Sequence, residues 1–378
     1  MKTKLPNTPT SIFSVMSAMA MEYNAINLSQ GFPNFKSDPV LIDLVSKAMK
    51  DGHNQYAPMA GDVYLRETIC NKMHQLYNTT YSPDTDIVIT AGATQAIFTA
   101  IAATISIGDE VIIFTPAYDC YGPTIQLFGG KVIEMQLASP YFTPDWEAVR
   151  NVISNNTKMI IINTPHNPSG MLFSETDMLQ LQQISEEHNL LVISDEVYEH
   201  IIFDGEKHQS AATFEQLAKR SFITASFGKT FHNTGWKMGY CLGPKTLMDE
   251  FKKVHQYNVF SVNHPFQKAL AEYLQNENTY LGLGQFYQQK RDFFLNLIKD
   301  SKFKILPSKG TYFQLLDFSE ISQKSDKAFA EILTKQHKLA TIPISVFNKD
   351  ALDEKIIRVC FAKTEETLID AAKILKSL

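Results

Sequence analysis

Short apolar runs, separated by mixed or polar segments, recur along most of the chain. They predict strands at residues 86–90, 110–114, 131–135, 159–163, 190–194 and 222–225. Most of these runs are almost continuously apolar, which is typical of strands covered on both faces. Helical patterns, such as residues 91–105 and 175–188, lie between several of them. The alternation predicts an α/β fold with a mostly parallel sheet between two layers of helices.

The pattern changes near the C-terminus. A long helical pattern at residues 285–299 is followed by two segments, 303–306 and 311–316, that alternate like half-exposed strands. The rest of the chain predicts helices at residues 328–337 and 365–378 and a strand at residues 355–360. This succession indicates a separate α+β unit.

We therefore expect a large domain over residues 40–290 and a small α+β domain over residues 291–378. Residues 1–39 would form an N-terminal arm that is also part of the small domain. Within this arm, Ile12, Val15, Met16 and Met19 have the spacing of one helix face. Residues 12–21 therefore predict an amphipathic helix rather than a signal peptide.

Composition narrows the class of protein. The formal net charge of -5 argues against a general nucleic-acid surface. No apolar run approaches transmembrane length. The four cysteines are scattered, without CxxC spacing or a histidine at ligand spacing, which indicates free thiols in a reducing compartment. We expect a cytoplasmic protein that needs no metal ion.

Polar side chains follow four of the predicted strands. Tyr118 follows the strand that ends at residue 114, residues 163–167 follow the strand at 159–163, and Asp195 and Tyr198 follow the strand at 190–194. Residues 226–229, including Lys229, follow the last. Ligands of open α/β sheets bind beyond the carboxyl ends of the strands. The sequence therefore predicts that four segments bring polar groups to one edge of the sheet.

The chemistry of these groups is complementary. Lys229 is flanked by small residues, and a second cation, Lys237, lies eight positions later in a Gly-rich segment. Residues 92–94 open a helix directly after a strand, so their N–H groups could hold a phosphate. Asp195 could be a helix cap, but it could also pair with a pyridinium nitrogen. The amide of Asn167 could hold a phenolic oxygen. Together these groups indicate an electrophilic cofactor that carries a phosphate.

Two other motifs carry less weight. Ser226 and Lys229 match the S-x-x-K pattern of serine acyl-enzymes, but its partner motifs are out of order or missing. Residues 196–200 contain a Glu–His pair but lack the first histidine of a zinc helix. His166 is interpreted as structural.

Several runs of sequence resemble the class I and II aminotransferases of fold type I, which use pyridoxal phosphate. The runs are NTPHNPSG, SDEVYEH and SFGKTFHNTGWKMGYCLG, together with INLSQGFPNF, NQYAPMAGDVYLRE and KIIRVCFAK. The similarity extends over nearly the whole chain. Within the family, the chain is most similar to the branch of methionine and kynurenine (glutamine) aminotransferases.

The resemblance implies a role for each matching residue. Lys229 would form the internal Schiff base and then act as general base and acid on the substrate Cα. Asp195 would pair with the pyridinium nitrogen, Asn167 and Tyr198 would bind the ring oxygen, and Tyr118 would stack on the ring. The phosphate would be held by Ala93, Thr94, Ser226 and Lys237, and by Tyr56 of a second subunit. Many relatives have arginine where this chain has Lys237.

The substrate would be held from another side. Arg358 would clamp the α-carboxylate, assisted by Gly31 and Asn167. Phe13, Phe260 and Tyr56 would line the side-chain pocket, and no second arginine is apparent for a side-chain carboxylate. The resemblance thus implies a homodimer that transfers the amino group of methionine, glutamine or an aromatic amino acid to a 2-oxo acid.

Two alternatives remain open at this stage. Cysteine-S-conjugate β-lyases and related enzymes share these motifs, so the same cofactor could support elimination. A ligand-sensing module derived from an aminotransferase is a second possibility. Such regulators usually carry a basic helix-turn-helix extension, which this chain lacks, and intact Lys229 and Arg358 favour turnover.

Overall fold

The structure is a computed structural model and describes residues 3–6 and 8–378. Its centre is a seven-stranded sheet with the order β2-β8-β7-β6-β5-β3-β4. The strands are β2 (Ile87–Thr90), β3 (Glu110–Thr115), β4 (Lys131–Gln136), β5 (Thr157–Asn163), β6 (Leu191–Asp195), β7 (Ser221–Ser226) and β8 (Gly239–Leu242). In this sheet, β8 runs in the direction opposite to the other six strands. The predicted α/β fold with a mostly parallel sheet is confirmed.

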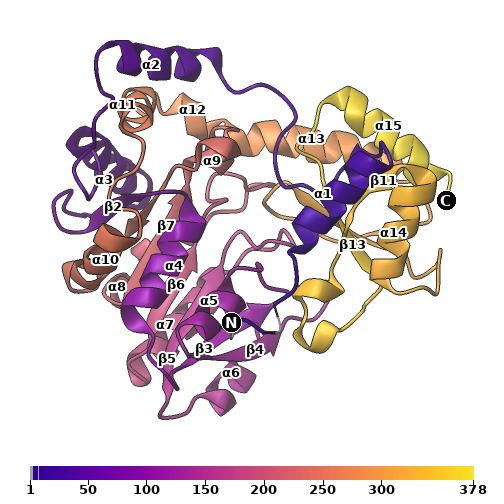
Figure 1. Ribbon diagram of the computed structural model, residues 1–378. Helices are drawn as coiled ribbons and strands as arrows, with labels where there is room; N and C mark the ends of the chain where they lie inside the picture. The colour runs from indigo at the N-terminus through magenta and orange to yellow at the C-terminus, as the bar shows by residue number, and fades with distance from the viewer. Residues whose placement is uncertain (1–2, 7) are drawn as a thin grey trace.

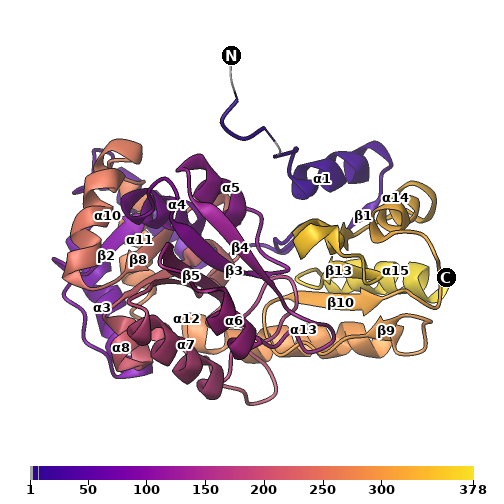
Figure 2. The same ribbon diagram turned by 90° about the horizontal axis from the view of Figure 1, so that it is seen from below.

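Both faces of this sheet are buried. Along β3, Ile112 and Phe114 belong to one apolar core, whereas Val111 and Ile113 belong to a second core on the opposite face. This alternation explains the continuous apolar runs, because each successive side chain enters a different core. Figures 1 and 2 show the helices that cover the two faces.

The second core is covered by α4 (Ala93–Thr104), α5 (Tyr121–Leu127) and α10 (Lys245–Asn258). The helices α3 (Val63–Tyr77), α7 (Glu175–Glu187), α8 (Glu215–Ala218) and α11 (His264–Tyr273) contribute to the first. The other helices of this region are α2 (Pro39–Lys50), α6 (Trp146–Val152), α9 (Phe227–Thr230) and α12 (Asn278–Leu281).

A second, antiparallel sheet has the order β12-β13-β10-β9. Its strands are β9 (Lys304–Ile305), β10 (Phe313–Asp317), β12 (Ile342–Pro343) and β13 (Ile356–Cys360), and the helices of this part are α13 (Leu283–Ile298), α14 (Asp326–His337) and α15 (Glu365–Lys376). The four-stranded sheet and these helices lie at the opposite end of the molecule from β2 and α10 (Figure 2).

The expectation of a half-exposed strand at residues 311–316 is wrong. β10 begins at Phe313, and its first four residues are buried. Gln314, the polar residue that produced the alternation, is itself buried, and its amide donates to the carbonyls of Leu306 (2.6 Å) and Leu315 (2.9 Å). The amide nitrogen is therefore satisfied inside the core, whereas Oε1 has no hydrogen-bond partner among the described residues.

The N-terminal arm lies beside the second sheet. Its helix α1 (Ile12–Glu22) confirms the predicted helix, and β1 (Ile26–Asn27) pairs in parallel with β11 (Leu339–Ala340). Met16 and Ala20 are buried and Phe13 packs against the core, but Val15 is exposed. Ile12 and Met19 also pack against the core, as predicted, so of the four predicted positions only Val15 does not face inward. Among the described residues, no helix has the length and apolar composition needed to span a membrane.

Candidate active site

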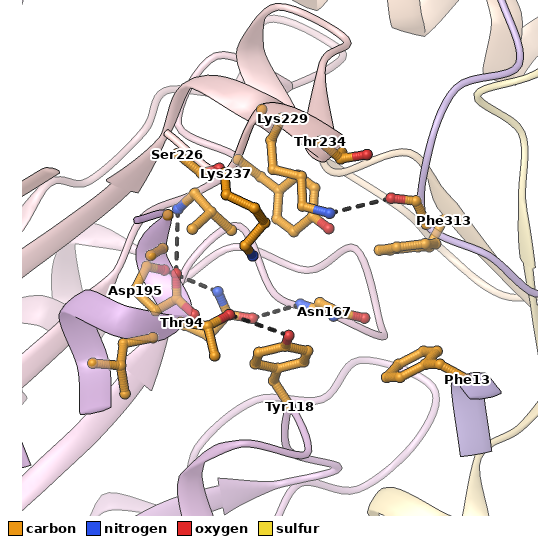
Figure 3. Close-up of a pocket in the computed structure, with 18 of the residues that line it drawn as sticks. Phe13, Thr94, Tyr118, Asn167, Asp195, Ser226, Lys229, Thr234, Lys237 and Phe313 are labelled. Carbon is orange, nitrogen blue, oxygen red and sulfur yellow. Dashed lines mark hydrogen bonds between the residues drawn. The ribbon is translucent and has the colours of Figure 1, made fainter. Parts of the chain in front are cut away.

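One cavity collects nearly all the predicted site residues. It lies at the carboxyl ends of β5, β6 and β7, and it is also bordered by the N-terminal arm and the second sheet. The predicted residues that line it are Phe13, Gly31, Ala93, Thr94, Tyr118, Asn167, Asp195, Tyr198, Ser226, Lys229, Lys237 and Arg358. Figure 3 shows that Lys229, Lys237, Asn167 and Tyr118 point toward one shared space.

Lys229 lies on α9, the short helix that follows β7. Its Nζ donates a hydrogen bond to the carbonyl oxygen of Gly31 at 3.1 Å. It also lies 5.9 Å from the ring centroids of Tyr198 and Tyr312. Burial lowers the pKa of Lys229 to about 8, because the charged form loses its hydration. A substantial fraction of this amine is therefore neutral near pH 8, which a solvated lysine does not achieve.

Asp195 ends β6 and is buried. Its Oδ2 accepts a hydrogen bond of 2.6 Å from the hydroxyl of Tyr121, and its Oδ1 accepts one of 3.4 Å from the N–H of Val197. Burial raises the pKa of Asp195 to about 6, against the opposite effect of the Tyr121 hydrogen bond. A carboxylate held in a buried site can pair strongly with a cation or an acidic N–H.

The loop after β5 connects Asp195 to the opposite wall of the cavity. Asn163 donates from Nδ2 to the carbonyl oxygen of Asp195 at 2.9 Å and accepts from the backbone N–H of Asn167 at 2.7 Å. Asn167 in turn accepts from Nη1 of Arg358 at 2.7 Å. His166 is buried, with contacts of 2.6 Å to Ser169 Oγ and 3.0 Å to the carbonyl oxygen of Pro116, so it is structural as expected.

The N-terminus of α4 and Lys237 lie close together. Gly92 is the N-cap of α4 and has φ of 78°. A Cβ at this position would lie 3.3 Å from Nζ of Lys237, so the absence of a side chain lets the cation approach the helix end. The hydroxyls of Thr94 and Tyr118 are 3.5 Å apart on the other side. Unpaired N–H groups and a lysine at one point form an anion site.

Arg358 lies in the middle of β13 and is buried. Its Nη2 donates to the carbonyl oxygen of Ser29 at 2.9 Å, and its Nε has no hydrogen-bond partner in the described part of the chain. The guanidinium lies between two aromatic rings, 3.8 Å from the centroid of Phe313 and 5.2 Å from that of Phe13. The rings fix its plane, and a guanidinium has five donors in total, so donors remain for a carboxylate.

Tyr56 and Phe260 do not line the cavity of their own chain. Their rings contact each other edge to face, with centroids 5.4 Å apart, and their exposed fractions are 80% and 44%. Two large, exposed aromatic side chains that contact each other are unusual on the surface of a monomer.

Other lining residues were not predicted. They are Gln30, Ile97, Val197, Gly228, Thr234, Met238 and Phe313. Gln30 and Phe313 come from the N-terminal arm and β10, whose positions relative to the sheet no local pattern reveals. Tyr121 was also missed, although it lies three positions after Tyr118.

Residues 196–200, the segment with a Glu–His pair, take part in a buried ion pair outside the cavity. Glu199 accepts from Nζ of Lys72 at 2.6 Å and from the hydroxyl of Tyr77 at 2.7 Å, and His200 lies 3.5 Å from the same carboxylate. All of these groups lie outside the cavity lining. In the described residues, no group of three or more His, Cys, Asp or Glu side chains is arranged to hold a metal ion.

The fold and this constellation match one protein family. Residues 23–375 match the model of the family described as aminotransferase class I and II, and the chain belongs to that family. It is therefore an enzyme that transfers an amino group.

Individual relatives agree with this assignment. The chain is 47% identical to methionine aminotransferase of Escherichia coli over 100% of its own length and 98% of that protein. It is 32% identical to kynurenine–oxoglutarate transaminase of Dictyostelium discoideum, over 95% and 92% of the two chains. A crystal structure of an E. coli protein with methionine aminotransferase function superposes with a TM-score of 0.98, at 47% identity, covering 100% and 99% of the two chains.

Proposed function

We propose that this aminotransferase binds pyridoxal 5′-phosphate in the cavity. We further propose that it transfers the amino group of a large, uncharged amino acid to a 2-oxo acid, with methionine, glutamine and aromatic amino acids as donors. One observation carries the proposal. A lysine with a lowered pKa, a buried acid, an anion site and a guanidinium all border the same cavity.

The residues present fit each part of the cofactor. Lys237, the N-terminus of α4 and the hydroxyls of Thr94 and Ser226 would hold the phosphate. Tyr118 would stack on the ring. Asp195 would accept the N–H of the ring nitrogen, and Asn167 and Tyr198 would bind the ring oxygen. When bound, pyridoxal phosphate supplies an aldehyde that condenses with amines and a ring that accepts electrons from the substrate Cα.

Lys229 has two tasks in this account. Its neutral amine is the group that condenses with an aldehyde, and burial supplies the neutral form at moderate pH. When free, the same amine would act as the general base that takes the proton from the substrate Cα and as the general acid that returns it. The hydrogen bond to Gly31 holds Nζ near the substrate side of the cavity. A positioned acid–base group of this kind contributes roughly 10²–10⁴-fold to the rate.

Arg358 would orient the substrate. Its guanidinium would bind the α-carboxylate, because its plane is fixed by Phe13 and Phe313 and its orientation by Asn167. Because Lys229 borders the same cavity, the α-amino group of a substrate held in this way would face Lys229. A fixed guanidinium orients the substrate as well as attracting its carboxylate. This orientation increases the rate, because misaligned substrates react slowly.

The side-chain pocket favours large, uncharged donors. Phe13, Tyr118 and Phe313 give it aromatic walls. The basic side chains that line the described cavity are Lys229, Lys237 and Arg358, and each already has a task, so no basic group is left for a side-chain carboxylate. Apolar pockets discriminate weakly, at roughly 1–3 kcal/mol per methylene, so we expect several good donors rather than one.

The site is proposed to be completed by a second copy of the chain. The exposed pair Tyr56 and Phe260 would enter the neighbouring subunit's cavity, with Tyr56 at the phosphate and Phe260 at the side-chain pocket. Further exposed apolar residues lie nearby in the fold, on α2 and α3, which both pack against α11: Val40, Ile42, Met49, Val63 and Tyr64. A closed two-fold dimer is the commonest way to cover such a surface.

Two further points belong to this proposal. The predicted division into an arm (1–39), a large domain (40–290) and a small domain (291–378) is supported by the two separate sheets and by the pairing of β1 with β11. A cytoplasmic location is supported by the four free cysteines, since paired cysteines are typical of oxidising compartments.

The test is a panel of amino acids added to the purified protein with pyridoxal phosphate. Methionine, glutamine and aromatic amino acids should change the absorbance of the bound cofactor and yield the corresponding 2-oxo acids. Aspartate should do so poorly. Absence of any spectral change would refute transamination, and pyruvate plus ammonia from a cysteine conjugate without an acceptor would favour the lyase reaction.

A further inference from the structure

The carboxylate of Asp195 is held by one short side-chain hydrogen bond. The hydroxyl of Tyr121 donates to Oδ2 at 2.6 Å, whereas Oδ1 accepts only the longer bond from Val197 among the described residues. Both side chains are 3% exposed. A hydrogen bond to a charged acceptor in a buried site is stronger than one between neutral groups.

Tyr121 reaches Asp195 from a different element. It is the first residue of α5, and its ring meets that of Tyr118 edge to face, with centroids 5.8 Å apart. The ring belongs to the apolar core beneath α4 and α10 and does not line the cavity. Tyr121 therefore cannot contact a substrate or cofactor in the cavity directly. An effect of its hydroxyl on the reaction would pass through Asp195, the group to which it donates.

We propose that Tyr121 is a positioning residue for amino-group transfer, whose hydroxyl fixes the orientation of the Asp195 carboxylate and stabilises its ionised form. This inference rests on the proposed function, in which Asp195 pairs with the ring nitrogen. Because Oδ2 accepts the short bond from Tyr121 and Oδ1 only the long bond from Val197, Oδ1 is the oxygen that we assign to the ring N–H.

The hydrogen bond from Tyr121 is one of several interactions that determine the pKa of Asp195. Burial raises the pKa of Asp195 to about 6, Tyr121 and Lys229 lower it, and the neighbouring Glu196 carboxylate raises it. Tyr118 and Cys120 are the other ionisable groups near this pair. Loss of the Tyr121 hydroxyl removes the strongest group that favours the charged form. The acid would then be protonated more readily and would hold the ring proton less well.

The test compares Tyr121→Phe, Asp195→Asn and the double variant with the wild-type protein, each loaded with pyridoxal phosphate. The main readout is the pH at which the absorbance of the bound cofactor changes. We expect Tyr121→Phe to move this midpoint in the same direction as Asp195→Asn but by less, and the double variant to match Asp195→Asn. The kcat for methionine should fall roughly tenfold while its KM changes by less than about twofold.

Tyr287→Phe is the matched control. Tyr287 is fully buried, and its hydroxyl has no hydrogen-bond partner in the described residues, so this variant loses the same atom without loss of a bond. It should titrate like the wild type. If Asp195→Asn itself leaves the titration unchanged, the proposed role of Asp195 fails. If Asp195→Asn moves the midpoint and Tyr121→Phe behaves like Tyr287→Phe, only the inference about Tyr121 fails.

A second substitution keeps the proposal testable if Tyr121→Phe does not fold. 3-Fluorotyrosine at position 121 preserves the ring and makes the hydroxyl a stronger donor. The midpoint should then move in the direction opposite to that caused by Asp195→Asn, while 3-fluorotyrosine at position 287 should have no effect. An unchanged midpoint with fluorotyrosine at position 121 would overturn the proposal.

Discussion

Arg358 and Asn167 are joined by a hydrogen bond of 2.7 Å that links the two sheets of the molecule. Arg358 lies in β13 of the four-stranded sheet, and Asn167 lies in the loop after β5 of the seven-stranded sheet. The bond fixes the guanidinium at the point where we place the substrate carboxylate. It thereby connects substrate binding to the loop that also supports Asp195 through Asn163.

Replacement of Asn167 by alanine should therefore weaken substrate binding. A hydrogen bond to a charged group is worth roughly 1.5–3 kcal/mol, so we expect KM for methionine to rise at least about tenfold. Asn233→Ala is the control, because the Asn233 amide is buried without a partner in the described residues. Equal KM values for the two variants would show that the bond to Arg358 does not orient the substrate.

The buried pair of Lys72 and Glu199 should make a large contribution to the free energy of unfolding. Their charged atoms are 2.6 Å apart, with side-chain exposures of 5% and 6%. Lys72→Met would leave Glu199 buried and unpaired, at a cost of roughly 3–5 kcal/mol. Adding Glu199→Gln should restore part of the loss. Lys47→Met breaks an exposed pair with Glu272 and should cost less than about 1 kcal/mol.

The same pair should make the stability of the folded protein depend on pH. Burial raises the pKa of Glu199, but Lys72, His200 and His208 together lower it more, so the net pKa lies well below the ordinary 4.5. Stability from the pair is thus present above pH 4.5 and is lost as the pH falls below it. Denaturation midpoints of wild type and Lys72→Met should converge on acidification. A gap that stays constant down to acid unfolding would contradict this account.

Lys229 should make the opposite contribution in the cofactor-free protein. Its pKa is lowered from 10.5 to about 8, so below pH 8 the folded state carries a buried charge that the unfolded state carries in water. Wild-type stability relative to Lys229→Met should therefore rise between pH 8 and 10.5, by about 3 kcal/mol in total. Denaturant midpoints at pH 7 and pH 9.5 measure this. A difference that does not change with pH would mean that burial does not lower the pKa of Lys229.

Mixed dimers test whether the site is shared between subunits. Lys229→Ala and Tyr56→Phe chains should each have low activity alone. If Tyr56 serves the partner's site, each mixed dimer contains one doubly altered site and one intact site, so activity returns on mixing. If Tyr56 serves its own chain, every site keeps one defect and mixing restores nothing. Subunit exchange is verified with a tag on one of the two variants.

The strand ends were predictable because the strands of a buried parallel sheet are continuous apolar runs in the sequence. Continuous apolar runs located β5, β6 and β7, and the polar residues just beyond them supplied Asn167, Asp195 and Lys229. Side chains brought in by distant segments were harder to predict. Phe313 and Gln30 enter the cavity through the packing of the second sheet and the arm, which local patterns do not encode.

Two other differences have equally physical causes. Gln314 resembled a surface residue because only the three-dimensional contacts reveal that its amide nitrogen donates to two backbone carbonyls. Tyr121 resembled an ordinary core aromatic, since its hydroxyl contacts a residue 74 positions away. Tyr56 and Phe260 cannot be placed at a site from a single chain, because both are exposed on it.

The central claim is that Lys229 is the residue that bonds covalently to pyridoxal phosphate. The most direct measurement is to add the cofactor, reduce the linkage with borohydride, digest the protein and locate the added mass by mass spectrometry. We predict one modified residue per chain, Lys229, and no modification of the nearby Lys237. Lys229→Ala should still bind the cofactor but remain unlabelled and nearly inactive. Labelling of Lys237 in the wild-type protein, or undiminished turnover by Lys229→Ala, would contradict the account.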